Sequence, residues 1–417
     1  MPDALKRFLT KWSCVCVGVS VLLAMGIAGM STAQAKNTIK LGALMPMTGD
    51  LQAYGTSCIT GVRLAAEQIN DQGGVLNSEL EIKVGDTQTK PQAGIDAAQK
   101  LVSIGNAFGI VGALSSGVTI PVAQSVTSSS KVPQISPAST SPVITTLDDN
   151  DFLFRSVPSD AFQGVAMAEL VEEAGFTNVA TLYVNNDYGE GLAVNFKKAF
   201  EKAGGQVTGS LPYEPGNASY RGELSKAASK GAEALILIGY PENGVTILRQ
   251  ALEEGYFQKF VYSDGLKAPE IIKAIGAQYL NGSFGTAPQA MTDSPSAQEY
   301  LDAYKEKYGQ VPPKPYIDTS YDGVYALALA AEKAGTTEGP AVRDALREVC
   351  NPPGKRILPG EWSKAVELLK NGEDIDYAGA SGSMDFDENG DVGGTFAHWA
   401  IQDGEIVTVK VFEPSMD

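Results

Sequence analysis

Two serine- and threonine-rich turns contain the side chains of this sequence best suited to hold a small anion. Residues 112–119 (GALSSGVT) follow an apolar run and precede a helical segment, and residues 136–142 (SPASTSP) follow a second apolar run. Hydroxyls and backbone N–H groups at the start of a helix favour a carboxylate, because the helix dipole is positive there. Each turn taken alone is better explained by ordinary turn and cap chemistry. Two such turns after two strands of one sheet favour a binding site.

One carboxylate would complement these turns. Asp264 follows an apolar run in the segment Tyr262-Ser263-Asp264-Gly265. If it faces the same cleft as the two turns, it could pair with a ligand ammonium, and the three features together would describe a zwitterion. If it does not, Asp264-Gly265 is an ordinary solvated turn.

Catalytic chemistry has little support. The order Ser116, Asp264, His398 exists, but no Gly-x-Ser-x-Gly elbow accompanies it, and His398 is the single histidine of the chain and lies in an alternating strand-like segment. One histidine without a close cysteine pair beyond residue 35 makes a zinc site improbable. Nucleotide-binding motifs are absent as well. We therefore expect a protein that is not an enzyme and has no metal or cofactor.

A calcium site is the one metal alternative. Residues 385–391 (DFDENGD) resemble the start of a calcium-binding loop, but its twelfth position is Phe396, where a bidentate glutamate is needed. Asn389-Gly390 between two strand-like runs, 384–387 and 395–401, is better explained as a hairpin turn.

The first 35 residues are typical of a secretory signal peptide. Three basic residues precede an apolar run at 15–28, and Ala33-Gln34-Ala35 follows as a small-x-small cleavage site. The apolar run is shorter than the roughly 20 residues that span a bilayer. We expect cleavage after Ala35 and export to the periplasm.

The net charge of the chain excludes two classes of binding partner. The chain has 32 basic and 49 acidic side chains and a net charge of −17, which becomes −19 once residues 1–35 are removed. Such an acidic chain argues against nucleic acid and anionic lipid as partners.

Cys58 and Cys350 are the cysteines left after cleavage. In an oxidising compartment we expect them to form a disulfide, and two separate buried thiols are the alternative.

Strand-like and helix-like segments alternate through the chain, which is typical of a parallel sheet covered on both faces. The pattern starts again near residue 179, with Tyr54-Gly55 and Tyr188-Gly189 at matching positions. We therefore expect an α/β protein with two doubly wound, Rossmann-like lobes and a cleft between them. Ligands of such sheets bind beyond the carboxyl ends of the strands, where both Tyr-Gly turns would lie.

Several of these segments together resemble the periplasmic leucine/isoleucine/valine-type (branched-chain amino acid) binding proteins of ABC transporters. The resemblance runs over nearly all of residues 38–410. The segments that carry it are 112–119, 135–140, 186–191 (NDYGEG), 247–251 (ILRQA) and 65–74 (AAEQINDQGG).

The resemblance implies the type I, Venus-flytrap fold, in which a hinge joins the lobes. Lobe 1 would comprise residues 36–157 and about 288–349, and lobe 2 residues 158–287 and about 350–417. It also implies an amino-acid ligand, a membrane permease as partner and a monomer. A short amide, a urea, an aromatic acid or a sensory role with the same fold are the alternatives.

The resemblance also implies roles for single residues. Ser116 and Thr140 would bind the ligand α-carboxylate, and Thr140, the Ala138 carbonyl and Asp264 would hold the α-ammonium. Asp264 is one methylene shorter than the glutamate of relatives, and Ser115 stands where some relatives have a disulfide cysteine. The ligand-binding residues expected on this basis are Tyr54, Ser116, Ala138, Ser139, Thr140, Tyr188, Tyr240, Asp264 and Tyr321.

Overall fold

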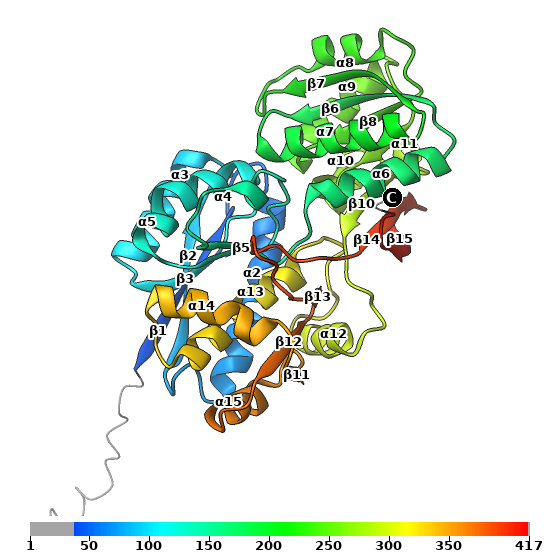
Figure 1. The fold of residues 1–417 in the computed structure, drawn as a ribbon. Coiled ribbons are helices and arrows are strands. Elements are labelled where there is room, and N and C mark those ends of the chain that lie inside the picture. Colours follow the sequence, from blue (N-terminus) through cyan, green and yellow to red (C-terminus); the bar gives the residue numbers. More distant parts are fainter. Residues whose placement is uncertain (1–36, 416–417) are drawn as a thin grey trace, which may run out of the picture. The chain divides into compact units, whose positions relative to one another are not determined.

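A computed structural model describes residues 37–415 of the chain. The predicted signal peptide and its cleavage site lie outside the described residues. Within this range the chain forms two large sheets and one small sheet, with helices packed against them (Figure 1). No helix in the range is both long and apolar enough to cross a membrane.

Lobe 1 is built on a five-stranded parallel sheet with the order β2-β1-β3-β4-β5. Helices α2 and α13 pack together on the sheet, and α3 packs with α4 against β1–β3. All six residues of β3 are buried, as expected for a strand covered on both faces. The strands are β1 (Thr38–Met45), β2 (Glu79–Asp86), β3 (Ala107–Gly112), β4 (Gln134–Ser136) and β5 (Leu153–Arg155), and the helices are α2 (Gln52–Asp71), α3 (Pro91–Ser103), α4 (Ser116–Val122), α5 (Ser128–Ser130) and α13 (Ile317–Ala334).

Lobe 2 repeats this topology. Its seven-stranded sheet has the order β15-β14-β10-β9-β8-β6-β7, in which β6 to β10 are parallel and β14 and β15 antiparallel. The strands are β6 (Asn178–Val184), β7 (Gln206–Tyr213), β8 (Ala234–Ile238), β9 (Phe260–Tyr262), β10 (Phe284–Pro288), β14 (Phe396–Gln402) and β15 (Glu405–Phe412). The helices are α6 (Asp160–Glu173), α7 (Asp187–Lys202), α8 (Arg221–Ala228), α9 (Pro241–Glu253), α10 (Pro269–Ile275) and α11 (Ala277–Leu280). The repeat expected from residue 179 onward therefore exists as two sheets of matching strand order.

Three connections run between the lobes: β5 to α6, β10 to α12 (Pro295–Tyr308), and the segment from β13 to β14. A three-stranded sheet of β11 (Lys355–Ile357), β12 (Ile375–Gly379) and β13 (Gly382–Ser383) precedes the last of them, with α14 (Gly339–Cys350) and α15 (Trp362–Lys370) beside it. These elements pack on α13 of lobe 1. The expected boundary at residue 350 differs from this arrangement, because the chain returns to the lobe 2 sheet at β14.

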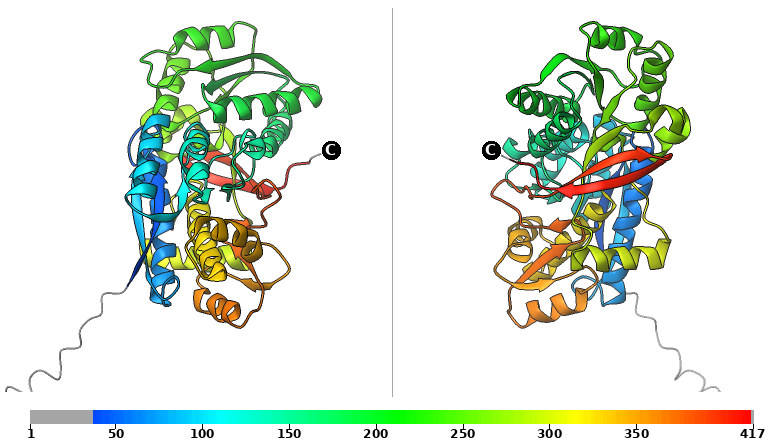
Figure 2. Two further views of the ribbon diagram at one scale, coloured as in Figure 1. Left: turned by 60° about the vertical axis from the view of Figure 1, so that its left-hand side comes forward. Right: turned by 90° about the vertical axis from the view of Figure 1, so that its right-hand side faces the viewer.

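The hairpin near the C-terminus also differs from the prediction. Residues 384–387 are not a strand; Asp387 instead closes a turn by accepting the Asn389 and Asp391 N–H groups on its carboxylate. The hairpin is β14–β15, which turns at Asp403-Gly404 and extends the lobe 2 sheet (Figure 2). Asn389-Gly390 is thus a turn in a connection between lobes.

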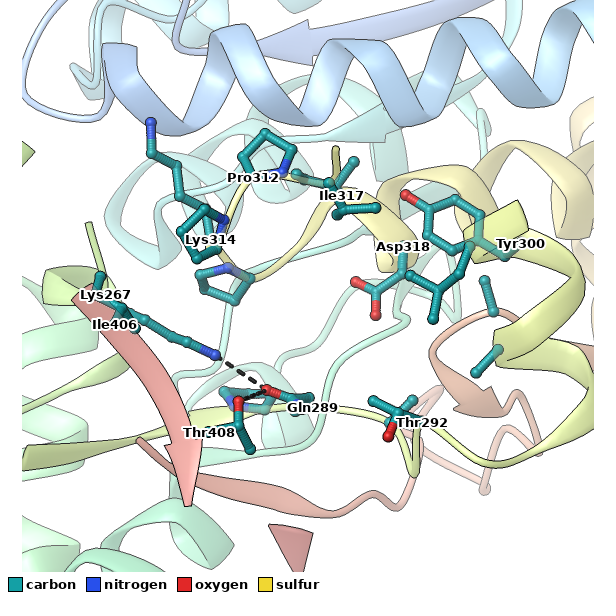
Figure 3. Close-up of a pocket in the computed structure, with 18 residues that line it drawn as sticks. Lys267, Gln289, Thr292, Tyr300, Pro312, Lys314, Ile317, Asp318, Ile406 and Thr408 are labelled. Carbon is teal, nitrogen blue, oxygen red and sulfur yellow. Dashed lines mark hydrogen bonds between the residues drawn. The ribbon is translucent and has the colours of Figure 1, made fainter. Parts of the chain in front are cut away.

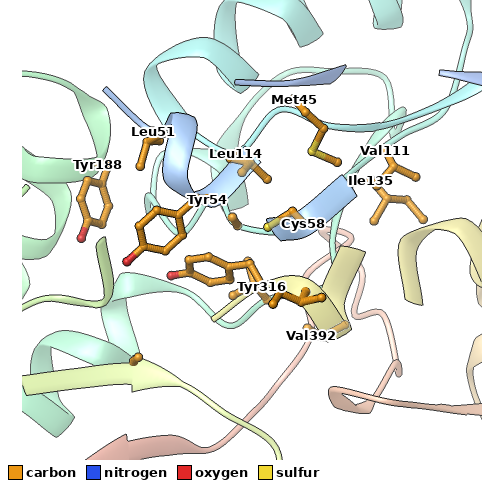
Figure 4. Close-up of a cluster of buried hydrophobic side chains, with 14 of the residues drawn as sticks. Met45, Leu51, Tyr54, Cys58, Val111, Leu114, Ile135, Tyr188, Tyr316 and Val392 are labelled. Atoms are coloured by element: carbon orange, nitrogen blue, oxygen red, sulfur yellow. The ribbon is translucent and has the colours of Figure 1, made fainter. Parts of the chain in front are cut away.

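The predicted disulfide is wrong. Cys58 and Cys350 are free thiols, and both are buried. Cys58 lies on α2 in the apolar cluster that reaches from the sheet to the inter-lobe tyrosines (Figure 4). Cys350 ends α14. Both helices pack on α13, so the fold brings each thiol to that helix instead of to the other thiol.

Candidate functional site

A small buried cavity lies where the carboxyl ends of the two parallel sheets meet. Its volume is about 20 Å³, enough for one water molecule. Wall residues follow the strands on either side of the point where strand order reverses, β1 and β3 in lobe 1 and β6 and β8 in lobe 2. Ala138 and Asp264 follow the next strand of each sheet, β4 and β9. Ligands of doubly wound sheets bind at this topological position. The lining residues are Leu51, Tyr54, Leu114, Ser115, Ala138, Tyr188, Tyr240, Asp264, Gly265 and Tyr316.

Gly112 allows the turn after β3 to reach the cavity. Its φ is +134°, and a Cβ there would come within 2.1 Å of the Leu44 carbonyl oxygen, so no other residue fits without a backbone shift. The turn that follows carries Leu114 and Ser115 into the cavity wall. The Ser115 hydroxyl lies 3.0 Å from the Tyr240 hydroxyl of lobe 2.

The two hydroxyl-rich turns are bonded to each other. Ser136 donates to the Ala113 carbonyl at 2.7 Å, and the Ser139 hydroxyl lies 2.7 Å from that of Thr119. Ser116 accepts the Ser141 N–H at 3.2 Å. The turns expected to share one site are therefore adjacent. The hydroxyls of Ser116 and Ser139 hold the turns together, and neither residue lines the cavity.

Lobe 2 supplies two stacked tyrosines. Asn186 caps α7 by accepting the Gly189 N–H, and this turn places Tyr188 directly after β6. The rings of Tyr188 and Tyr240 stack with centroids 5.7 Å apart. The Asn186 amide also donates to the Tyr240 hydroxyl at 3.1 Å, which fixes the second ring.

Asp264 is the buried charge of the cavity, with 3% of its surface exposed. Its carboxylate accepts hydrogen bonds from Tyr188 (2.7 Å), Gln163 (2.9 Å) and Tyr316 (2.5 Å). Its backbone carbonyl accepts the Tyr54 hydroxyl at 2.9 Å. Burial raises the pKa of Asp264, and these donors oppose the shift by stabilising the charged form.

A second buried carboxyl, Asp160, lies in the first turn of α6. Thr140 donates to one of its oxygens at 2.8 Å, while the other has no partner among residues 37–415. Burial, and then the charge of Asp264, hold the pKa of Asp160 well above its usual range. Because Asp264 accepts three side-chain donors and Asp160 one, the charged form is stabilised more strongly at Asp264, and Asp160 is the more readily protonated of the two carboxyls.

Five of the predicted residues line the cavity: Tyr54, Ala138, Tyr188, Tyr240 and Asp264. Thr140 does not line the cavity; its hydroxyl donates to Asp160, which is not a lining residue either. Tyr321 lies elsewhere in lobe 1, where it stacks on Tyr325 and accepts the Gly360 N–H. Tyr316 occupies the cavity wall instead, five residues earlier.

Sequence reasoning missed Ser115, Asp160, Gln163 and Tyr316. Asp160 and Gln163 resemble ordinary residues of a helix start, since Ser159 caps α6 just before them. Tyr316 follows a proline-rich segment and has a positive φ of 78°. An aromatic residue with that backbone is unusual, but the conformation cannot be read from residue types.

The described residues contain no cluster of three or more metal-binding side chains. His398 is paired with Thr286 on β10 and lies against Phe284, within the lobe 2 sheet. Within residues 37–415, no direct hydrogen bond is found between His398 and Ser116 or Asp264.

Comparison with known proteins agrees with this geometry. Residues 38–352 match the family model described as periplasmic binding protein. The chain belongs to this family. It is 33% identical over 327 residues, 78% of this chain and 86% of the other, to a leucine-, isoleucine-, valine-, threonine- and alanine-binding protein of Pseudomonas aeruginosa.

Solved structures show the same fold. A leucine-binding protein of Thermotoga maritima aligns with a TM-score of 0.77 and 27% identity, over 90% of this chain and 99% of that one. A solute-binding protein of an ABC transporter from R. palustris, in complex with benzoate, aligns with a TM-score of 0.75 and 16% identity, over 91% of this chain and 97% of that one. At that identity the second likeness bears on fold alone. This periplasmic binding protein thus has the type I architecture of two parallel-sheet lobes.

Proposed function

We propose that this protein is the extracytoplasmic solute-binding component of an ABC transporter and binds an amino acid, branched-chain or similar, between its lobes. We further propose that it is exported by residues 1–35, cleaved after Ala35, and delivers its ligand as a monomer to a membrane permease. The relatives named above support the ligand class. The observation that carries it is Asp264, a buried carboxylate fixed by three donors opposite the hydroxyl-bearing turns of lobe 1.

The proposed binding mode follows from the two walls. The ligand carboxylate would bind at the turns 114–116 and 138–140, where N–H groups and hydroxyls meet the start of α4. The ligand ammonium would bind Asp264 and the Ala138 carbonyl. The stacked rings of Tyr188 and Tyr240, with Tyr54, would cover the side chain. Exclusion of water strengthens charged hydrogen bonds of this kind.

An aromatic acid is the second candidate, since a related fold binds benzoate. Such a ligand has no ammonium and would leave the buried Asp264 without a counter-charge. A buried charge that is left unpaired, next to a second anionic group, is strongly disfavoured. The amino acid is therefore favoured.

The test is a thermal-shift screen of protein that has been unfolded and refolded to remove bound ligand. We expect amino acids with aliphatic side chains to raise the melting temperature, and amides, urea and aromatic acids not to. In calorimetry, Asp264→Asn should weaken amino-acid binding about 100-fold, since truncating a buried charged partner costs about 2–5 kcal/mol. Asp293→Asn, on an exposed carboxylate, is the matched control. Stabilisation by benzoate but not by amino acids would contradict the proposal, as would hydrolysis of any compound in the screen.

A further inference from the structure

A larger pocket lies beside the connections between the lobes and is distinct from the cleft cavity. Its volume is about 190 Å³, against about 20 Å³ for the cavity at Asp264, and the two share no lining residue. Lobe 2 contributes Lys267 and Thr408, the connection after β10 contributes Gln289, and the start of α13 contributes Asp318 (Figure 3). The walls come from both lobes.

Lys267 supplies a buried positive charge at one side of this pocket. Its exposed fraction is 6%, and its ammonium donates to the Gln289 side-chain carbonyl at 3.0 Å. No carboxylate oxygen of the described residues lies within 4.0 Å of it. Burial lowers the pKa of Lys267 to about 8. A buried lysine without a carboxylate partner is rare, because desolvation of the charge is not compensated.

Asp318 supplies the opposite charge. It lies in the first turn of α13, is partly exposed, and accepts the N–H of Thr319 at 2.9 Å. Burial raises the pKa of Asp318, and the charge of Lys267 partly offsets this. The carboxylate and the ammonium therefore influence each other without forming an ion pair. Figure 3 shows the two groups entering the pocket from different elements.

Apolar side chains also line the pocket. They include Leu301, Val311, Pro312 and Ile317. We propose that the pocket is a second binding site, for a small zwitterion whose carboxylate pairs with Lys267 and whose ammonium pairs with Asp318 across an apolar chain. Each ligand group would supply the counter-charge that the protein lacks there, while the methylene groups would pack on the proline and aliphatic wall.

The test uses ω-amino acids as probes, from 3-aminopropanoate to 6-aminohexanoate, titrated calorimetrically into refolded protein. We expect at least one to bind with a Kd below about 1 mM. Lys267→Met and Asp318→Asn should each weaken that probe at least tenfold. The alkanoate and the alkylamine of the same chain length should each bind at least tenfold more weakly than the probe.

Two further variants separate this site from the cleft. Lys273→Met removes an exposed lysine of the same lobe and should leave the affinity unchanged. Asp264→Asn should also leave it unchanged, which keeps this result independent of the proposed function. Circular dichroism confirms that each variant is folded. Loss of probe binding in Asp264→Asn but not in Lys267→Met would overturn the assignment, as would equal affinity for the alkanoate or absence of binding by every probe.

Discussion

Replacement by asparagine should have different effects at the two buried carboxyls, Asp160 and Asp264. The strongly raised pKa of Asp160 favours its neutral form at pH 7, so Asp160→Asn keeps the side chain neutral and keeps an oxygen that can accept from Thr140, and amino-acid affinity should stay within a few-fold. Asp264→Asn removes the charge itself and should weaken binding about 100-fold. Calorimetry on both variants measures the difference, and equal losses would contradict the proton assignment.

The same pair fixes the pH dependence of binding. The pKa of Asp264 is raised, so on acidification it takes up a proton at higher pH than an exposed aspartate, and affinity should fall from that point downward. Asp160 is neutral throughout this range, so Asp160→Asn should show the same acid limb. A profile that moves in Asp160→Asn would assign the titration to Asp160.

Lys267 has a separate effect on stability. Its pKa falls from 10.5 to about 8 on folding, so below pH 8 the folded state carries an unfavourable buried ammonium. Between about pH 8 and pH 10.5 the unfolded chain binds this proton and the folded chain does not, so stability rises with pH. Lys267→Met should therefore be more stable than the parent at pH 7, by on the order of 1–3 kcal/mol. This advantage should vanish near pH 10, as urea unfolding at both pH values would show.

Only some of the residues around the cleft cavity could be predicted from the sequence. Tyr188 and Asp264 could be predicted because each follows a strand of a parallel sheet, and topology then fixes where strand ends lie. Tyr240 is expected only from the family resemblance. Asp160 and Gln163 follow the connection from β5 to α6, and Tyr316 lies in the loop between α12 and α13. Their positions depend on contacts such as Gln163 to Asp264, 101 residues apart, which no local pattern encodes.

At the scale of elements, strand and helix alternation correctly predicted both parallel sheets, because buried parallel strands are continuous apolar runs. The segment 351–395 was harder. It forms a small sheet that packs on α13 and then a connection held by polar bonds, such as Arg155 to Asp391. Turn residues such as Asn389-Gly390 occur both in hairpins and in connections between lobes. Which of the two they form depends on the strand that β14 pairs with in its hairpin, and that strand is β15.

Both cysteines are buried in helices that pack against α13, and this burial predicts that their thiols are unreactive. Burial raises the pKa of Cys58 to about 12, and burial also raises the pKa of Cys350 well above its usual range. Because the thiolate is the reactive form, neither should react with a thiol reagent in the native protein. In denaturant without reductant, two thiols per mature chain should react, as mass spectrometry would show. If neither cysteine reacts in denaturant, Cys58 and Cys350 form a disulfide and the assignment of free thiols is wrong.

An ion pair between Arg155 and Asp391 is one of several polar contacts that attach the connection from β13 to β14 to lobe 1; Thr145 also donates to Asp391. Arg155, fully buried, donates to Asp391 through Nε at 2.6 Å and Nη2 at 2.5 Å. Asp391→Ala would leave the guanidinium buried without a counter-charge, and should reduce the free energy of unfolding by about 3–5 kcal/mol. Glu173→Ala breaks the surface pair with Lys410 and should cost less than about 1 kcal/mol. Similar losses for both variants would remove the special role of Arg155.

At the scale of the whole molecule, the cleft cavity is too small for any amino acid. A volume of about 20 Å³ accommodates one water, and direct bonds from Tyr54 to Asp264 and between Ser115 and Tyr240 close it from both lobes. An amino acid can reach Asp264 only if these bonds open. Hinge motion is the established way in which periplasmic binding proteins admit and enclose a ligand.

Lobe separation should therefore be measurable in solution. In small-angle X-ray scattering, protein stripped by refolding should show a larger radius of gyration than the same protein saturated with its amino acid, since the ligand can shift the equilibrium toward the lobe arrangement that it contacts on both sides. Asp264→Ala should keep the larger radius when the amino acid is added at the concentration that saturates the parent, because the ammonium has lost its partner. Equal radii with and without ligand in the parent would mean that entry requires only local displacement of tyrosines such as Tyr54 and Tyr240, without separation of the lobes.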